Sequence, residues 1–569
     1  WEIGWFTDAK QAKAFTREGA EASRSGPYPL GQRAEFTSTL WQRTAEYNLR
    51  ELAMAQGLAG ELRAAPSGGY NVPWVRDGTN AAAYPVYAGY DKLLTRWRPL
   101  LMANPSELTW GGKTYRTYGT LVGFTQKYEQ DGALYPILAV YTDCLVGSGP
   151  PPSENELAIL EDGIRYLREQ FYSEELGLFC ELYINEASLK DAPEWVAGER
   201  FEALKQDGEW IRRAYTLYLN EFAYGALLQL AELEMLSGRT EKAEGYLEMA
   251  LGLREAIETR LWLPDEGHYL VGWGLNESDK LVPLDWYYWD SFFDYIWALT
   301  LTPNLSHPGR AHQGLLAIWD QRKVAMPNSI AGIYFAPSYA HSAYTLNALG
   351  DEGQAERLIE PLIERIWATD PHPPEQLERA MAGAVPETMH TVAYHRPELF
   401  TCGPLAYGLS SFGVLADRWG LTLRPQGKLK GFEGFEWKGK ARSIGLVEGA
   451  PTEVTLYVDG QAISNCLKSP IAASQANRFE LRAEAQVWPV LTYTPAGVRS
   501  VDVTRSGLYF HLTSLGPTWV MLAGAAGVEC SVTDAKGQML PVEVYPVGEQ
   551  LCVDLKTAPR GDFIVKVEP

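Results

Sequence analysis

The stretch from Asn71 to Asn80 holds the residues best suited to bind a ligand rich in hydroxyl groups. Arg76 offers a fork of hydrogen-bond donors, Asp77 offers two acceptor oxygens for neighbouring hydroxyls, and Trp74 offers a flat apolar face. Together these three side chains suit a sugar. The same Arg and Asp could instead form a buried ion pair that caps a helix, so the rest of the chain has to distinguish the two interpretations.

Two further loops carry carboxylates that could act on such a ligand. Hydrolysis of a glycoside with inversion needs one carboxyl group that protonates the departing oxygen and a second that activates water. Glu209 and Glu387 stand in these two loops, and we expect them to be the pair. Asp207 and Glu181 are alternatives to Glu209. A single Glu in a long loop is more often solvated surface, so the assignment depends on these residues sharing one end of the fold.

Other polar and aromatic residues are expected around the same pocket or on its margins. Trp210 and Tyr334 are predicted to bind substrate. The run Glu129–Asp131 directly precedes a predicted helix, and we interpret it as a helix cap, with a place in the cleft as the alternative. His390 and His395 have no metal-ligand spacing, and no phosphate-binding Gly-rich loop occurs, so neither a metal nor a cofactor is expected.

The elements that must position these residues are helices over most of the chain. Apolar periodicity from Phe36 to Gly420 predicts helices separated by loops rich in Gly, Pro and aromatic residues. Gly238, Gly350 and Gly420 are predicted helix stops. The predicted spans are 36–56, 77–90, 91–103, 132–146, 154–171, 211–237, 240–262, 286–301, 308–320, 336–349, 352–367 and 404–419.

These helices alternate in character. The even-numbered ones are apolar or rich in small residues, and the odd-numbered ones carry the charges. An inner ring of apolar helices within an outer ring of amphipathic ones is the arrangement this predicts, which is a mainly α (α/α)6 barrel. In such a barrel the loops that enter the inner helices share one end. The alternation therefore predicts Arg76, Asp77, Glu209 and Glu387 around one pocket.

After Gly420 the apolar period changes from helical to alternating. Residues 452–460 alternate apolar and polar residues and end in an Asp-Gly turn, and four later segments look similar. A C-terminal β-sandwich is therefore predicted. The predicted division of the chain is an irregular lead-in over residues 1–35, a barrel over 36–420 and a β-sandwich over 421–569.

The segment Trp74-Val-Arg76-Asp77 resembles the W-x-R-D segment of glucoamylase-like enzymes (glycoside hydrolase family 15), which are (α/α)6 barrels. The resemblance implies that Arg76 and Asp77 bind the terminal sugar. It also implies that Glu209, in the loop before helix six, is the acid and that Glu387, in the loop before helix twelve, is the base. Residues 286–293 are similar to the W-D-S-x-F segment of family 63, which implies sugar binding by Trp289 and Asp290. Residues 421–439 resemble the β-cap that follows the barrel in family 65.

Composition limits the partners. The formal net charge of −21 argues against nucleic acid or an anionic membrane surface, because phosphate binding needs basic patches. No apolar run is long enough to span a bilayer. The six Cys show neither a zinc spacing nor a dense disulfide pattern, so a reducing compartment fits slightly better. The chain begins at Trp1 and shows no secretion signal, which leaves its localisation open.

These observations favour an inverting exo-acting glycoside hydrolase, of α-glucosidase type, acting on a small glycoside or oligosaccharide. An inverting phosphorylase on the same barrel is the alternative, and it would need an anion pocket where Glu387 lies. A lyase or epimerase would favour His and Tyr at the cleft. A non-catalytic carbohydrate-binding protein would bind sugars without cleaving them.

Overall fold

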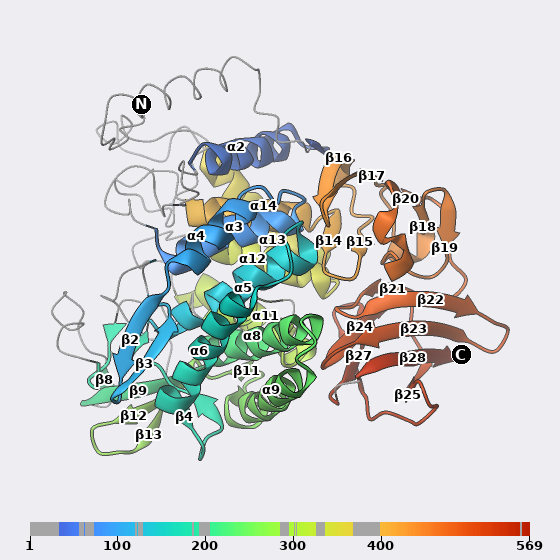
Figure 1. Cartoon of the computed structure of the whole chain (residues 1–569). Coiled ribbons are helices and arrows are strands. Elements are labelled where there is room, and N and C mark those ends of the chain that lie inside the picture. Colours follow the sequence, from blue (N-terminus) through green and yellow to red (C-terminus); the bar gives the residue numbers. More distant parts are fainter. Residues whose placement is uncertain are drawn as a thin grey trace, which may run out of the picture.

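The structure of the protein, a computed structural model, describes residues 33–55, 62, 73–119, 122, 129–184, 187–192, 205–206, 208–284, 295–300, 302, 304–325, 336–367, 399–557 and 560–568. Within these ranges helices dominate as far as residue 410, and strands dominate beyond it. Figure 1 shows the helices gathered on one side of the molecule and the later strands on the other.

The helices follow the predicted spans over most of their lengths. A 3-10 turn, η1 (Gln130–Ala133), leads into α5, and a π-helical turn, η2 (Thr142–Val146), follows it. The helices are α2 (Thr39–Ala55), α3 (Val75–Tyr87), α4 (Leu94–Ala103), α5 (Tyr135–Tyr141), α6 (Glu154–Phe171), α8 (Leu217–Leu236), α9 (Thr240–Arg260), α11 (Pro308–Ala325), α12 (Ala336–Ala348), α13 (Glu352–Trp367) and α14 (Leu399–Ser410).

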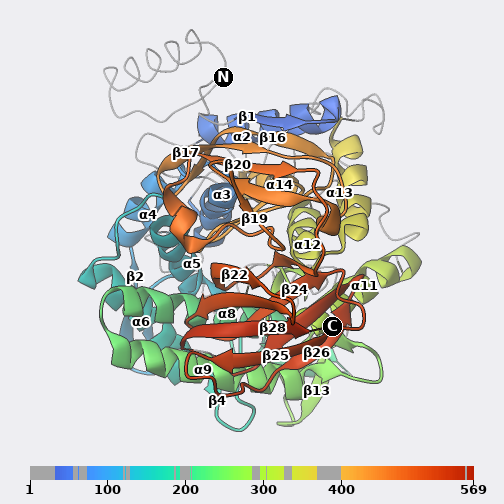
Figure 2. The same ribbon diagram turned by 90° about the vertical axis from the view of Figure 1, so that its right-hand side faces the viewer.

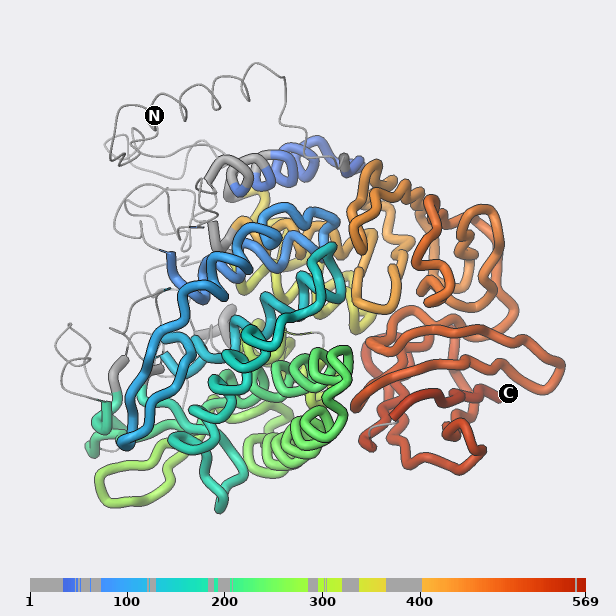
Figure 3. The backbone as a smooth tube through the Cα atoms, in the orientation of Figure 1, coloured from blue at the N-terminus to red at the C-terminus, as the bar shows by residue number. Residues whose placement is uncertain are grey.

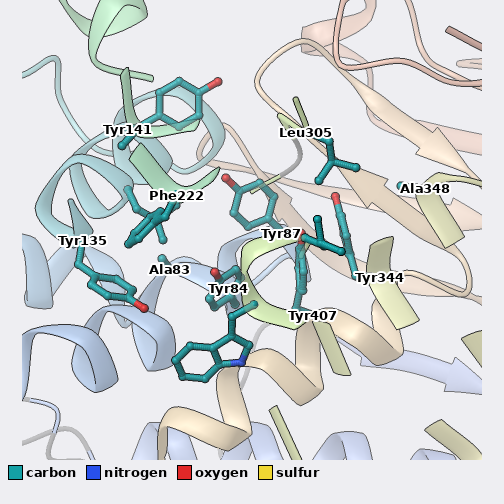
Figure 4. Packing of buried hydrophobic residues seen from close by; sticks show 14 of the residues in the cluster. Ala83, Tyr84, Tyr87, Tyr135, Tyr141, Phe222, Leu305, Tyr344, Ala348 and Tyr407 are labelled. Atoms are coloured by element: carbon teal, nitrogen blue, oxygen red, sulfur yellow. The ribbon is translucent and has the colours of Figure 1, made fainter. Parts of the chain in front are cut away.

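The apolar helices pack side by side in the interior. Helix α14 packs against α3 and α12, α3 packs against α5, and α5 packs against α8. Helices α3, α5 and α8 are buried over nearly their whole length, whereas α6 buries one face only. Aromatic rings fill the space between them: Tyr407 of α14 stacks on Tyr344 of α12 at 3.5 Å and lies 5.0 Å from Tyr84 of α3 (Figure 4).

Glycines allow α14 to approach its two neighbours closely. A Cβ atom on Gly403 would lie 2.5 Å from the carbonyl oxygen of Asn80 in α3, and one on Gly408 would lie 2.6 Å from that of Ala340 in α12. No side chain fits between these backbones. The contacts of α14 with α3 and α12 are therefore made backbone to backbone.

The structure corrects two of the predicted helices. The predicted start of the 211–237 helix is wrong, because the segment up to Thr216 is strand β9 (Glu209–Thr216). The strand leads directly into α8, with Ala214 and Tyr215 close to the apolar start of the helix, so no clear boundary between them is visible in the sequence. The end of the 404–419 helix is also wrong. A hairpin of β14 (Val414–Ala416) and β15 (Leu421–Leu423) follows α14, and Gly420 lies in its turn.

Two predicted helix stops are confirmed. Gly238 follows α8 with a φ of 75°, and Gly350 follows α12 with a φ of 81°. Both are left-handed conformations that favour glycine at a helix C-terminus. Each stop is followed closely by the next helix, so α8 pairs with α9 and α12 pairs with α13.

A six-stranded sheet pairs the first described strand, β1, with strands that follow the helices. Its strand order is β1-β16-β17-β20-β18-β19, and β1 pairs antiparallel with β16. The predicted Asp-Gly turn joins β18 to β19 and has positive φ at both Asp459 and Gly460. The strands are β1 (Arg33–Phe36), β16 (Leu429–Trp437), β17 (Lys440–Gly445), β18 (Thr455–Val458), β19 (Gln461–Ile463) and β20 (Arg478–Arg482).

The last strands form a β-sandwich. Two four-stranded sheets, β21-β24-β27-β26 and β22-β23-β28-β25, enclose an apolar core that is separate from the core of the helices. Figure 2 shows these strands in front of α8 and α9, and Figure 3 shows the two sheets as adjacent layers. The strands are β21 (Val490–Tyr493), β22 (Gly497–Val503), β23 (Leu508–Ser514), β24 (Thr518–Ala523), β25 (Glu529–Asp534), β26 (Glu543–Val547), β27 (Gln550–Leu555) and β28 (Gly561–Glu568).

Short strands also form in the loops of the helical region. A four-stranded sheet has the order β13-β12-β9-β8, and the other short strands pair as hairpins. These strands are β2 (Ser106–Trp110), β3 (Lys113–Thr117), β4 (Tyr172–Ser173), β5 (Leu178–Phe179), β6 (Tyr183–Ile184), β7 (Ala187–Ser188), β8 (Lys205–Gln206), β10 (Trp262–Leu263), β11 (His268–Tyr269), β12 (Gly272–Asn276) and β13 (Leu281–Leu284).

None of the helices in the described part of the chain combines the length and apolar character that crossing a bilayer requires. The six cysteines all lie in described ranges, and no disulfide bond joins any two of them.

Candidate active site

Arg76 is surrounded by three carboxylates. Its Nε atom lies 3.5 Å from Asp77 Oδ1, and its Nη1 atom lies 3.6 Å from Glu129 Oε2 and 3.8 Å from Asp131 Oδ2. The Arg76 side chain is 22% exposed, whereas the three acidic side chains are at most 10% exposed. We call this group the Arg76 cluster; its carboxylate side chains are nearly buried, and the Arg76 side chain is partly exposed.

The first turn of α3 fixes the position of Arg76 and Asp77. Trp74 has extended backbone angles and is the N-cap residue, so α3 begins immediately after it. Trp97 of α4 holds this turn in place: a Cβ atom on Gly78 would lie 2.3 Å from its ring, and its indole nitrogen donates to Thr79 Oγ1 at 3.1 Å. The N-terminal end of the helix dipole also favours the negative charge of Asp77.

The loop before α5 supplies the second arm of the cluster. Glu129 occupies the N-cap position of η1 but makes no side-chain capping hydrogen bond. The interpretation of Glu129–Asp131 as a helix cap is therefore wrong for Glu129. Its carboxylate, and that of Asp131, point instead to Arg76.

The first turn of α8 supplies the third arm. The Tyr218 hydroxyl donates to Asp131 Oδ2 at 2.7 Å, and the Tyr135 and Tyr218 hydroxyls lie 3.1 Å apart. Because the single Tyr218 hydrogen goes to Asp131, Tyr135 must donate to Tyr218. The other oxygen of Asp131, Oδ1, is buried and has no hydrogen-bond partner among the described residues.

An aromatic floor lies beneath the guanidinium. The Cζ atom of Arg76 is 6.0 Å from the centre of the Trp297 ring, and Tyr218 lies 6.2 Å from the same ring. His341 packs against Trp297 and Tyr84. Burial lowers the pKa of His341 to about 3, so this imidazole is neutral.

The charges of the cluster are unequal. Burial works against the charged form of Arg76, yet Glu129, Asp131 and Asp77 raise its pKa, so it stays charged. Burial raises the pKa of Asp77, although the charge of Arg76 opposes the shift. One cation therefore faces three carboxyl groups, an arrangement that offers both donors and acceptors to a polyhydroxylated ligand.

Glu181 lies next to this cluster. It is buried and accepts a hydrogen bond from the Thr216 hydroxyl, which also caps α8. The neighbouring backbone nitrogen, that of Leu182, donates to Gln130 Oε1 at 3.1 Å. Glu181 is thus tied to the segments that carry Asp131 and Tyr218.

Glu209 and Trp210 lie at the other end of β9. Glu209 Oε1 accepts from Ser278 Oγ at 3.0 Å, next to the tip of the β12–β13 hairpin, and Lys205 lies 3.8 Å over the Trp210 ring. Glu209 lies seven positions before Thr216 in β9, or roughly 23 Å at about 3.3 Å per residue. Among the described residues, the contacts of Glu209 and Trp210 are with β8 and the β12–β13 hairpin and not with the Arg76 cluster.

The remaining residues expected at the site, Asp207, Trp289, Asp290, Tyr334 and Glu387, lie outside the described residues. From the sequence, a place in the cleft was only the alternative for Glu129 and Asp131, and Tyr218 was not assigned to the site. The first two share a signal with Arg76 and Asp77, because both pairs stand at the entrance to an apolar helix. Tyr218 had no such signal, because the strand before α8 was not recognised.

Within the described part of the chain, no group of three or more His, Cys, Asp or Glu side chains could hold a metal ion. The carboxylates of the Arg76 cluster are thus spaced around a guanidinium rather than around a cation site. Their chemistry is hydrogen bonding to hydroxyl groups and proton transfer.

The sequence matches no protein-family model and no curated protein. Among solved structures it is similar to a GH78 family rhamnosidase of Bacillus sp. GL1 (TM-score 0.45, 15% identity, 72% of this chain and 39% of that one). It is also similar to the α-L-rhamnosidase from Dictyoglumus thermophilum (TM-score 0.44, 10% identity, 95% and 51%). A third is the GH63 mannosylglycerate hydrolase from Thermus thermophilus (TM-score 0.40, 14% identity, 65% and 99%). The chain spans about half or less of the length of the two rhamnosidases.

Proposed function

We propose that this protein is an inverting, exo-acting glycoside hydrolase of α-glucosidase type. The observation that carries the proposal is the Arg76 cluster, in which a partly exposed arginine side chain is set among buried carboxylates near an aromatic ring. Vicinal hydroxyls of a sugar match a guanidinium fork beside a carboxylate, and an apolar sugar face matches an indole.

The proposed scaffold is an (α/α)6 barrel over residues 36–420 followed by a β domain over 421–569. Contacts among α14, α3, α5 and α8, and between α12 and α14, support an inner ring of helices. The Arg76 cluster draws on the N-terminal ends of α3, α5 and α8, which supports a site at one end of that ring. The pairing of β1 with β16 adds residues 33–36 to the second region.

In the proposed mechanism Arg76 and Asp77 hold the terminal sugar while two carboxyl groups act on the bond. One protonates the departing oxygen, and Glu387 activates the attacking water from the opposite face. Among the candidates for the acid, Glu181 is favoured over Glu209, because Glu181 is buried beside Thr216 and Gln130 at the cluster. Asp207 stays an alternative. Inversion requires the two carboxyl groups to be roughly 6.5–9.5 Å apart.

A hydrolysis screen tests the proposal. The protein is incubated with α- and β-linked disaccharides and small glycosides, and the anomer of each released sugar is read by NMR before it mutarotates. Release of one sugar from the non-reducing end, with its configuration inverted, is the expected result. A retained configuration would reject the two-carboxylate inversion, and the absence of cleavage would favour a carbohydrate-binding protein.

Paired substitutions test the choice of acid. Glu181→Gln is expected to lower kcat by at least about 10²-fold on substrates with a poor leaving group, because general-acid assistance is typically worth 10²–10⁴-fold. Glu209→Gln serves as the matched control and is expected to retain most activity. The reverse outcome would assign the acid to Glu209.

The phosphorylase alternative is less well supported. An attacking phosphate would need a basic or hydroxyl-rich pocket, and the Arg76 cluster offers one cation against three carboxylates. Phosphate-dependent release of a sugar phosphate would decide for a phosphorylase.

A further inference from the structure

One carboxylate oxygen of Asp131 has a hydrogen-bond partner, and the other has none among the described residues. Its Oδ2 atom accepts from Tyr218 at 2.7 Å and lies 3.8 Å from Arg76 Nη1. Its Oδ1 atom is buried without a hydrogen-bond partner among the described residues. A buried acceptor without a hydrogen bond costs about 1–3 kcal/mol of free energy. A bound ligand could supply the missing donor.

The surroundings of Asp131 fit a sugar hydroxyl as that partner. Asp131 and Asp77 both lie against the guanidinium of Arg76, close enough that the charge of Asp131 raises the pKa of Asp77. The two carboxyl groups therefore flank one donor fork. A sugar bound to that fork would present adjacent hydroxyl groups to both.

The phenol pair fixes the direction of the bare oxygen. Tyr135 donates to Tyr218, and Tyr218 donates to Asp131, so the carboxylate cannot rotate freely. The Tyr218 ring is itself held between Phe222 and Trp297. A pre-oriented acceptor loses less entropy when it binds a hydroxyl than a mobile one does.

The net charge of the cluster limits which sugars can bind. Glu129, Asp131 and Asp77 outnumber Arg76, the cation that lies against all three. Two like charges 4 Å apart repel by about 4 kcal/mol at an effective dielectric constant of 20. A carboxylated or phosphorylated sugar would meet this repulsion, whereas a neutral one would not.

We propose that Asp131, oriented by Tyr218, is a specificity-determining residue that accepts a hydroxyl of a neutral, fully hydroxylated terminal sugar opposite Asp77. This rests on the proposed function only in that the Arg76 cluster binds a sugar. It does not require that the sugar be cleaved.

Sugar binding is measured directly by saturation-transfer difference NMR. The probes are D-glucose, D-mannose, D-galactose, L-rhamnose and D-glucuronate, followed by the monodeoxy analogues of the neutral sugar that binds most tightly. The proteins are the wild type, Asp131→Asn, Tyr218→Phe and a matched control, Asp143→Asn. Asp143 is also a buried aspartate with one oxygen paired to an arginine and one oxygen bare, but it lies by η2, outside the Arg76 cluster.

Asp131→Asn is expected to weaken binding of the best neutral sugar by about 10–100-fold, since a hydrogen bond to a charged group is typically worth that much. Tyr218→Phe is expected to weaken it by about 3–10-fold. One deoxy analogue should bind wild type and Asp131→Asn equally within threefold, because it lacks the hydroxyl that Asp131 accepts. Asp143→Asn should leave all affinities unchanged, and D-glucuronate should bind at least tenfold more weakly than D-glucose.

Equal losses for Asp131→Asn and Asp143→Asn would overturn the assignment, as would a uniform loss across all deoxy analogues. Tight binding of D-glucuronate, or no binding of any neutral sugar to the wild type, would overturn it too. Circular-dichroism melting of each variant identifies unfolded protein. If Asp131→Asn does not fold, Tyr218→Phe tests the same contact between Asp131 and the sugar hydroxyl. The expected binding pattern without hydrolysis would reject the proposed function alone, and hydrolysis unaffected by Asp131→Asn would reject this inference alone.

Discussion

Two arginines on neighbouring helices, Arg76 on α3 and Arg98 on α4, are bonded very differently. Arg98 forms a bidentate pair with Glu156 at 2.9 and 3.0 Å, and its Nη1 atom donates to Asp143 at 3.0 Å, to Cys144 Sγ and to a backbone carbonyl. The ion-pair distances from Arg76 to described residues are all 3.5 Å or longer.

The difference distinguishes an arginine that holds helices together from one that we propose to be open to a ligand. Arg98 is 4% exposed and ties α4 to η2 and α6. Arg76 is 22% exposed, and its ion pairs with described residues are longer than a normal hydrogen bond. Arg76 is therefore bonded less completely by the described residues than Arg98 is.

The largest expected effect that follows is on Arg76. Lysine keeps the charge but lacks the planar fork, so Arg76→Lys is expected to lower kcat/KM by about 10²–10³-fold. Its free energy of unfolding should change by less than about 1 kcal/mol, because no short bond is lost. Steady-state kinetics and urea unfolding measure the two quantities. A loss of stability without a loss of activity would contradict the distinction.

The matched change at Arg98 should have the opposite profile. Arg98→Lys breaks the bidentate pair with Glu156 and is expected to lower the free energy of unfolding by about 2–4 kcal/mol. Urea unfolding measures it. Activity at a temperature where the variant stays folded should remain within twofold of wild type. If kcat/KM fell as steeply as for Arg76→Lys, the two arginines would not differ in role.

The pH dependence of stability should differ in sign between Glu156, which pairs with Arg98, and Asp77, which lies beside Arg76. Although burial opposes it, hydrogen bonds from Arg98 and Ser153 lower the pKa of Glu156 below its ordinary 4.5. The stability it adds, about 1–3 kcal/mol, is present above pH 4.5 and is lost as the pH falls through the folded pKa. Burial raises the pKa of Asp77 above 3.8, so its contribution falls as the pH rises from 3.8 through the folded pKa.

Urea unfolding of Glu156→Gln and Asp77→Asn at several pH values from 3.5 to about 7 measures this contrast. Glu156→Gln should be less stable than wild type at neutral pH and should approach it in acid. The free energy of unfolding of Asp77→Asn should increase relative to that of wild type as the pH rises. Parallel curves for the two variants would show that the clusters have similar electrostatics.

The smallest expected effect is the rise in Tm that a bound ligand causes. An ammonium-bearing polyol such as Tris matches the excess negative charge of the Arg76 cluster, so it should raise Tm by about 1–2 °C at concentrations near ten times its Kd. Glycerol at the same concentration is the uncharged control. Differential scanning fluorimetry at fixed pH measures both, and equal shifts, or the same shift in Asp131→Asn, would place the effect outside the cluster.

The sequence was informative where a local signal decides the structure. Gly238 and Gly350 end helices because each adopts a left-handed conformation, and Asp459-Gly460 turns a hairpin for the same reason. Arg76 and Asp77 were also identified together, since both follow Trp74 in one helical turn.

The features that the sequence did not predict depend on contacts between residues far apart in the chain. The strand β9 was predicted as helix because its partner, β12, lies far along the chain. Glu129 resembled a cap, and only its distance to Arg76 reveals the ion pair. Glu209 was assigned as the acid by counting helices, and the structure places it at the start of β9, a strand that this count did not include.

The strand β1 has a consequence for how the protein is made. Its partner β16 begins at Leu429, and the Glu35–Lys430 pair spans 395 positions. At a synthesis rate of about 5–20 residues per second, β1 waits roughly 20–80 s on the ribosome before its neighbour emerges. During that interval the unpaired edge of β1 can pair with other chains. The completion of this sheet is therefore a late step in folding during synthesis.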